Sequence, residues 1–151
     1  MSWHKVWKDD PVFLHSIYFL VNPFEKEIYV SHTRRDLEIR FKEHVRGSDE
    51  FTRDFIKRLK DQKTLPKLIL AEQVRVTDRG INAYKLIWIR IAMENGFTPM
   101  NPPNAIINSQ NLFDYYIPKY IEREKIDFIE LCNNQEIEIQ ADEYAKYFTE
   151  K

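Results

Sequence analysis

The stretch that decides the fold is Ser16–His44, which reads SIYFLVNPFEKEIYVSHTRRDLEIRFKEH. Its first half predicts two strands, over 17–21 and 28–31, because both are short apolar runs rich in β-branched and aromatic residues. Asn22-Pro23 between them is a turn dipeptide, and Pro23 has no N–H to donate to a strand ladder. We therefore expect strand, turn and returning strand here.

A helix over 35–46 is expected next. Apolar residues recur there at helical spacing and would face the sheet: Leu37, Phe41 and Val45. Thr33 followed by Asp36 fits a capping box, with Thr33 as the cap. Arg40 and His44 lie four residues apart, on one flank of the apolar stripe. These two side chains are expected to converge with Tyr18 and Tyr29 at one edge of the sheet.

Two triplets and a helix pattern in this stretch resemble the GIY-YIG nuclease family. The triplets are Ser16-Ile17-Tyr18 and Tyr29-Val30-Ser31, with their tyrosines eleven residues apart. The helix pattern is T-x-x-x-L-x-x-R-x-x-x-H, which falls on Thr33, Leu37, Arg40 and His44. The similarity is close over about thirty residues and looser up to Asn104. Serine stands at both motif glycines, Ser16 and Ser31.

The resemblance implies hydrolysis of a DNA phosphodiester. Such a reaction needs a positioned water, a group that takes its proton, and cationic groups near the developing charge. The family would assign Arg40 to the phosphate and Tyr18 to activation of the nucleophile, with Tyr29 and His44 positioning them. Further substrate contacts are expected from basic or amide side chains: Arg34, Arg35, Lys85 and Asn104, with Asn101 as the alternative to Asn104.

The family also implies one Mg²⁺ held by a glutamate on the third helix, and that position falls on Lys85. A protonated lysine cannot bind a cation that needs anionic oxygen ligands. Glu72 on the third strand is a possible substitute. We therefore expect a GIY-YIG-like protein that binds DNA, with cleavage weakened or lost. The alternatives are an active Mg²⁺-dependent endonuclease with an altered ligand, or an inactive nuclease fold that binds a protein partner.

The chain after the first helix predicts further elements of the same domain. A helix over 49–62 carries basic residues on its outer face, which is either a phosphate-contacting surface or a solvated helix face: Arg53, Lys57, Arg58 and Lys60. A strand is expected over 67–76 and a helix over 80–94 that stops at Asn95-Gly96. The segment 98–104 reads as a rigid proline-rich loop.

The fold class expected from these elements is α+β, a three-stranded and mainly antiparallel sheet flanked by helices, over residues 12–104. An arm over 1–11 precedes it. Residues 105–151 are expected to form an extension packed on this domain, with a helix over about 111–124 interrupted at Pro118. A hairpin of 126–131 with 136–139 and a closing helix over 141–148 would complete the extension.

Composition sets the class of protein. Apolar residues make up 43% of the 151, and aromatic residues 14%, which argues against disorder. The net charge is -1, but residues 1–113 carry 18 basic and 14 acidic side chains. A basic body of this kind is compatible with local phosphate binding.

Cys132 is the only cysteine, and no apolar run approaches a membrane span. We expect a cytoplasmic protein with no membrane partner.

Overall fold

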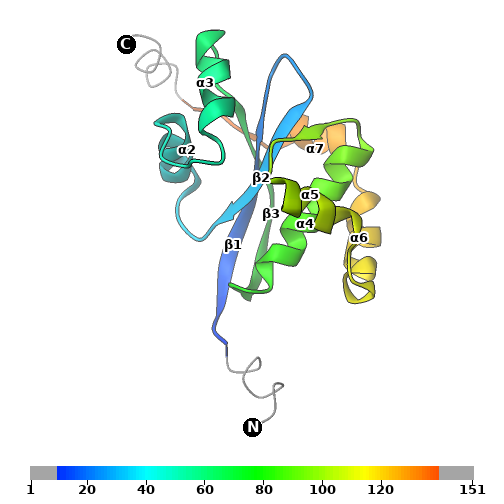
Figure 1. Ribbon diagram of the computed structural model, residues 1–151. Coiled ribbons are helices and arrows are strands. Elements are labelled where there is room, and N and C mark those ends of the chain that lie inside the picture. The colour runs from blue at the N-terminus through cyan, green and yellow to red at the C-terminus, as the bar shows by residue number, and fades with distance from the viewer. Residues whose placement is uncertain (1–9, 140–151) are drawn as a thin grey trace.

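The computed structural model describes residues 10–139, which form an α+β fold around a mixed sheet (Figure 1). The strands lie in the order β4-β2-β1-β3-β5. Their bounds are β1 Val12–Val21, β2 Glu27–Thr33, β3 Lys67–Thr77, β4 Thr98–Pro99 and β5 Glu136–Ile137. Strand β1 pairs antiparallel with β2 and with β3, whereas β4 runs parallel to β2.

The expectation of a three-stranded sheet was wrong. The three expected strands are present at the centre, but two strands of two residues each extend the sheet at its edges. A two-residue strand is too short to show an alternating pattern in a sequence. Both edge strands depend instead on long-range pairing, of Thr98 with Glu27 and of Ile137 with Leu68.

Helices cover both faces of the sheet. On one face lie α2, Leu37–Val45, and α3, Arg53–Asp61, while α4, Ile81–Glu94, packs on the other (Figure 1). This explains why the centre of β1 is apolar without alternation, since a strand covered on both faces buries every side chain. The remaining helices are α5 Pro103–Gln110, the 3₁₀ helix η1 Asp114–Tyr116, α6 Ile117–Glu124 and α7 Phe128–Asn134.

The helix ends follow from local chemistry. The cap of α2 is Asp36, not Thr33, and its carboxylate accepts the backbone N–H groups of Glu38 and Ile39. Two helices end next to a glycine with positive φ, as glycine permits: Gly47 after α2, at 80°, and Gly96 after α4, at 85°.

The C-terminal part differs most from expectation. The segment 98–104 is not all loop, because α5 begins at Pro103. Pro118 lies in the first turn of α6, where a proline costs no helix hydrogen bond, so it opens a helix and does not interrupt one. The expected hairpin is absent from the described chain, where residues 128–134 form α7.

The α4 side of the core continues into this C-terminal part. Tyr120 of α6 and Phe128 of α7 are buried there, and the ring centroids of Phe128 and Phe19 are 5.6 Å apart. The expected helix over 141–148 and most of the expected arm over 1–11 lie outside the described residues. No helix within 10–139 combines the length and the apolarity that a membrane crossing requires.

Candidate functional site

Tyr18 and Tyr29 lie on the same face of the sheet. In the β1–β2 register Tyr18 pairs with Ser31 and Leu20 pairs with Tyr29. Because side chains alternate along a strand, both tyrosines point to the face covered by α2 and α3. Tyr18 is fully buried there and Tyr29 nearly so. Burial raises the pKa of Tyr18, and burial with the nearby charge of Asp49 raises the pKa of Tyr29 to about 12.

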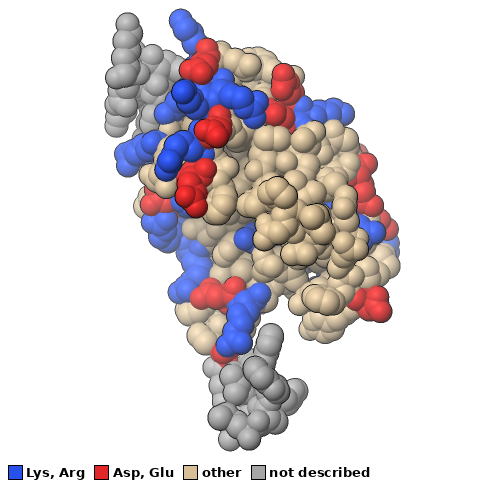
Figure 2. All heavy atoms as spheres, viewed as in Figure 1, with Lys and Arg blue, Asp and Glu red and all other residues tan. Residues whose placement is uncertain are grey.

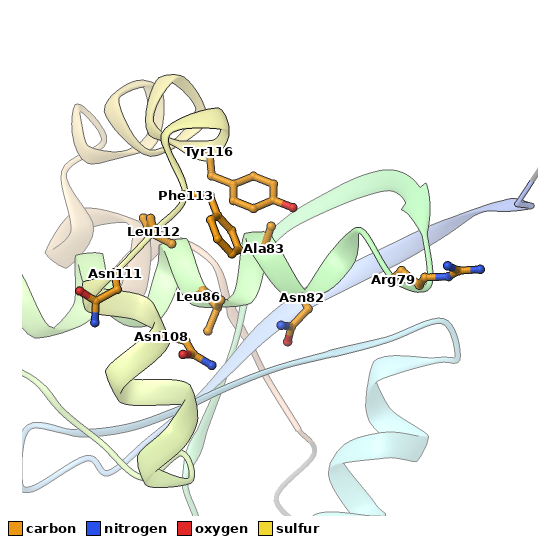
Figure 3. Close-up of a pocket in the computed structure, with 9 residues that line it drawn as sticks. All are labelled: Arg79, Asn82, Ala83, Leu86, Asn108, Asn111, Leu112, Phe113 and Tyr116. Carbon is orange, nitrogen blue, oxygen red and sulfur yellow. The ribbon is translucent and has the colours of Figure 1, made fainter. Parts of the chain in front are cut away.

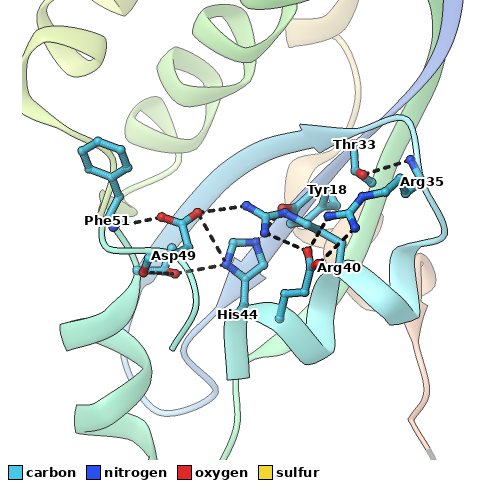
Figure 4. A network of polar contacts seen from close by, with 9 residues as sticks. Tyr18, Thr33, Arg35, Arg40, His44, Asp49 and Phe51 are labelled. Atoms are coloured by element: carbon cyan, nitrogen blue, oxygen red, sulfur yellow. Dashed lines mark hydrogen bonds and ion pairs between the residues drawn. The ribbon is translucent and has the colours of Figure 1, made fainter. Parts of the chain in front are cut away.

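A chain of hydrogen bonds runs from Tyr18 through His44 (Figure 4). The Tyr18 hydroxyl lies 2.6 Å from Nε2 of His44, and Nδ1 of His44 lies 3.0 Å from Oγ1 of Thr52. Burial, and then the charge of Arg40, lower the pKa of His44 to about 4, so its ring is neutral at pH 7. A protonated phenol donates to the unprotonated Nε2, which leaves Nδ1–H to donate to Thr52. Thr52 in turn donates to the carbonyl of Asp49 at 3.4 Å.

Arg40 lies beside this chain and is held by two carboxylates. Its guanidinium donates to Glu43 Oε1 at 3.1 Å and to Asp49 Oδ2 at 3.0 Å (Figure 4). Arg35 also pairs with Glu43, at 2.5 Å and 3.0 Å. Only 21% of the Arg40 side chain is exposed. Arg40 is therefore already neutralised, and a phosphate on its fork would have to displace a carboxylate.

The residues present do not fit a Mg²⁺ site. Magnesium needs oxygen ligands, above all free carboxylates. Glu43 and Asp49 are paired with Arg40. Glu72 is paired with Arg123 at 2.6 Å and accepts from Nε1 of Trp88 at 2.8 Å. Within the described ranges no group of three or more His, Cys, Asp or Glu side chains is arranged to hold a metal ion.

Lys85 belongs to α4, on the other face of the sheet. Burial lowers its pKa, and its charge contributes to lowering the pKa of His32. His32 alternates with Tyr29 and Ser31 along β2, so it points away from the tyrosine face. Nδ1 of His32 lies 3.3 Å from Nδ1 of buried His15. Nε2 of His15 lies 3.2 Å from Asp78 without the alignment of a hydrogen bond.

Arg34 and the two candidate asparagines also lie apart from the tyrosines. Arg34 pairs with Asp78 at 2.9 Å and stacks 3.4 Å from the ring of Phe13. Asn104 is exposed on α5. Asn101 has a structural role, since its carboxamide bonds both the N–H and the C=O of Val30, at 3.1 and 2.8 Å. The structure thus brings together Tyr18, Tyr29, Arg40, His44 and Arg35, but not Lys85, Arg34 or Asn104.

Three members of this network were missed from the sequence: Glu43, Asp49 and Thr52. Asp49 reads as a residue of the second helix, which starts only at Arg53. A hydroxyl or carboxylate before a helix normally indicates capping. Thr52 stands at that position but makes no side-chain capping hydrogen bond, and binds His44 instead. For Thr52 the only available signal was the absence of an acidic residue three positions later to complete a capping box. Glu43 could have been found, because it lies three residues after Arg40 on the same helix.

A basic hollow lies between α2 and α3. It has a volume of about 250 Å³. Its lining is Val45, Arg46, Gly47, Arg53, Ile56, Lys57 and Lys60. Within the described part of the chain no carboxylate lines it. Figure 2 shows Lys and Arg side chains gathered over α2 and α3, with acidic side chains between them. We call these seven residues the α2–α3 hollow.

The pKa shifts of His44 and His32 predict a loss of stability in mild acid. Both pKa values are about 4 in the folded protein. The pKa of His32 is lowered by burial and then by the charge of Lys85. The unfolded chain has values of about 6.5, so between these limits it binds more protons than the folded chain. Stability is present above pH 6.5 and falls as pH drops toward 4, by about 2 kcal/mol per histidine near pH 5.

Denaturant unfolding at neutral pH and near pH 5 measures this loss. A His44→Gln variant should show a smaller pH dependence than the parent, because it removes one of the histidines whose pKa is lowered on folding. An identical pH dependence in parent and variant would contradict a neutral, buried His44.

Comparisons of the chain with protein-family models, with curated proteins and with solved structures found no match.

Proposed function

We propose that this protein binds DNA through the phosphate backbone, and that it does so without efficient cleavage. The observation that carries the proposal is the α2–α3 hollow, where, among residues 10–139, four basic side chains and no carboxylate line one concave surface. Most protein–DNA hydrogen bonds go to phosphate and sugar, and they come from Arg and Lys in particular. Val45, which lines the hollow, directly follows His44 in the chain. A DNA backbone bound in the hollow would therefore pass next to the Tyr18–His44 network.

Two features favour binding over cleavage. Tyr18 and His44 are fully buried and hydrogen-bonded to each other, so neither presents a free group to a substrate. The carboxylates beside Arg40 are paired with it. In this arrangement the four residues that resemble the nuclease motif serve as a polar core that fixes α2 and α3 on the sheet. The basic surface of α2 and α3 then makes the contacts.

Lys57→Glu should weaken binding to a short duplex at low salt, whatever its sequence. Lys57 is exposed and lines the α2–α3 hollow, so the change replaces an attraction to phosphate with a repulsion. If one phosphate contact is lost, the slope of log affinity against log salt should decrease by about 1. Fluorescence anisotropy of a labelled duplex over a salt series measures both effects.

Lys125→Glu is the matched control, since Lys125 is exposed at the end of α6, on the far side of the sheet. Both variants change net charge equally. Equal weakening by the two would point to overall charge and not to the hollow. No binding of the parent protein to any duplex at low salt would refute the proposal.

The alternative is a metal-dependent endonuclease, and the parent protein itself tests it. A change at position 85 is not a test, because α4, which carries Lys85, covers the other face of the sheet from Tyr18. If the parent already cleaves plasmid DNA with Mg²⁺ or Mn²⁺, the protein is an active nuclease and the proposed loss of cleavage is wrong.

A further inference from the structure

A second pocket lies on the opposite side of the sheet, between α4 and the segment from α5 to η1 (Figure 3). Its volume is about 240 Å³, less than the roughly 300–1,000 Å³ of sites for drug-sized ligands. Leu86 of α4 contributes apolar lining. Figure 3 shows the carboxamides of Asn82 and Asn108 toward one end and the rings of Phe113 and Tyr116 toward the other. The size suits a single flat ring system.

The two carboxamides are available to a ligand. Asn82 projects from α4 and Asn108 from α5, and both side chains are exposed. Among residues 10–139 neither carboxamide makes a hydrogen bond to another protein group. Asn111, which also lines the pocket, differs because its side chain donates to the carbonyl of Ile107 at 3.0 Å. The pocket therefore offers two donor–acceptor pairs that only water satisfies.

The aromatic side of the pocket is unusually open. Phe113 is 75% exposed and its neighbour Tyr115 is 72% exposed. Tyr116 joins them, with ring centroids 6.2 Å from Phe113 and 5.0 Å from Tyr115. Exposed aromatic clusters of this kind are unfavourable in water unless something covers them. In proteins that bind single strands, such rings stack on unpaired bases.

The charge around the pocket favours a neutral ligand. Residues 95–113, which run from the end of α4 to the residue before η1, contain no charged side chain. Of the residues that the structure describes, no carboxylate lines the pocket to partner a cation. The charged residue among those lining it is Arg79, which pairs with Asp10 at 3.1 Å. The ligand that best suits the pocket is therefore a neutral, flat ring with hydrogen-bonding groups along its edges.

We propose that this pocket binds an adenine base. Adenine presents an acceptor, N7, next to a donor, the N6 amino group, and an asparagine carboxamide matches this pair with two hydrogen bonds. Guanine presents two acceptors along the same edge, which one carboxamide does not match. In the bound state the base stacks on Phe113 while the carboxamides of Asn82 and Asn108 read its edges. The base comes from a free nucleoside or from a single strand, and the site does not depend on phosphate binding at the α2–α3 hollow.

Titration of ¹⁵N-labelled protein with adenosine and with guanosine, followed by NMR, tests the site. Adenosine should shift the side-chain amide signals of Asn82 and Asn108 and bind about 5- to 150-fold more tightly than guanosine. Phe113→Ala should weaken adenosine binding by a similar factor, because base stacking on an aromatic ring is worth about 1–3 kcal/mol. Asn82→Asp keeps the shape of the side chain but removes its N–H donor, and it should also weaken adenosine binding.

Phe24→Ala is the control for Phe113→Ala, since Phe24 is a similarly exposed phenylalanine, 69% exposed in the β1–β2 turn and outside the pocket. It should leave adenosine binding unchanged, as should Lys57→Glu, because adenosine carries no phosphate. Oligodeoxyadenylate and oligothymidylate of equal length then identify the source of the base. If oligodeoxyadenylate binds more tightly than oligothymidylate and Phe113→Ala abolishes this binding, the base belongs to a single strand. If adenosine binds and neither oligonucleotide does, the base belongs to a free nucleoside. Absence of any shift, or equal shifts in parent and Phe113→Ala, overturns the proposal.

Discussion

His44→Ala is expected to lower the free energy of unfolding by about 3–4 kcal/mol. His44 is fully buried and bonded at both ring nitrogens, to Tyr18 and to Thr52. Alanine leaves a cavity, and it leaves the Tyr18 hydroxyl without its partner in a place that water does not reach. Urea unfolding followed by circular dichroism gives the difference at neutral pH.

Tyr18→Phe is the informative companion to that change. It removes the hydroxyl but keeps the ring, so no large cavity forms, and the expected cost is about 1–3 kcal/mol because Nε2 of His44 loses its partner. Because the two side chains share one hydrogen bond, the double variant should lose less stability than the two single losses added together. Strictly additive losses would mean that Tyr18 and His44 are not coupled.

Arg123→Ala is expected to cost about 3–5 kcal/mol, which would make it the other large effect. Arg123 of α6 forms two hydrogen bonds to Glu72 of β3, at 2.6 and 3.0 Å, and lies 4.9 Å from the ring centroid of Tyr84. The side chains of Arg123 and Glu72 are only 14% and 22% exposed. Removing the arginine therefore leaves a carboxylate largely shielded from water and without its cation.

Glu72→Ala should cost a similar amount, since it leaves the arginine unpaired. Replacing both partners together, by Glu72→Gln and Arg123→Met, should restore much of the stability, because no lone charge remains. Arg75→Ala serves as the control, as an exposed arginine of the same strand, and should change stability by less than about 0.5 kcal/mol. A cost for Arg123→Ala no larger than that of the control would contradict a buried ion pair.

The elements that sequence predicted well are those with strong local periodicity. The strand expected over 67–76 is β3 and the helix expected over 80–94 is α4, each within one residue at either end. Local patterns sufficed because the alternation of β3 and the apolar face of α4 are long enough to be read. By contrast, α7 over 128–134 was taken for part of a hairpin. Its seven residues span only two turns, too few for helical periodicity to exceed the hairpin signal of Asn133-Asn134.

The candidate site was predictable in part for the same reason. Strand alternation places Tyr18 and Tyr29 on one face, and helical spacing places Arg40 and His44 together on α2. Lys85 was expected beside Tyr18 because the family resemblance puts the metal-binding position there, whereas local spacing does not determine which face of the sheet α4 covers. Of the two carboxylate partners of Arg40, Asp49 was hidden, because it comes from a turn whose path depends on tertiary packing.

The side chain of Asn101 has a consequence for how the protein behaves at high concentration. A sheet edge with free N–H and C=O groups is a template on which another chain can add a strand, and this is a common start of aggregation. Here the outer edge of β2 is closed by two residues of β4 and then by the Asn101 carboxamide, which takes up the N–H and C=O of Val30. Pro99 adds a position with no N–H to offer. One short segment after α4 thus ends the sheet and protects the protein from polymerising along that edge.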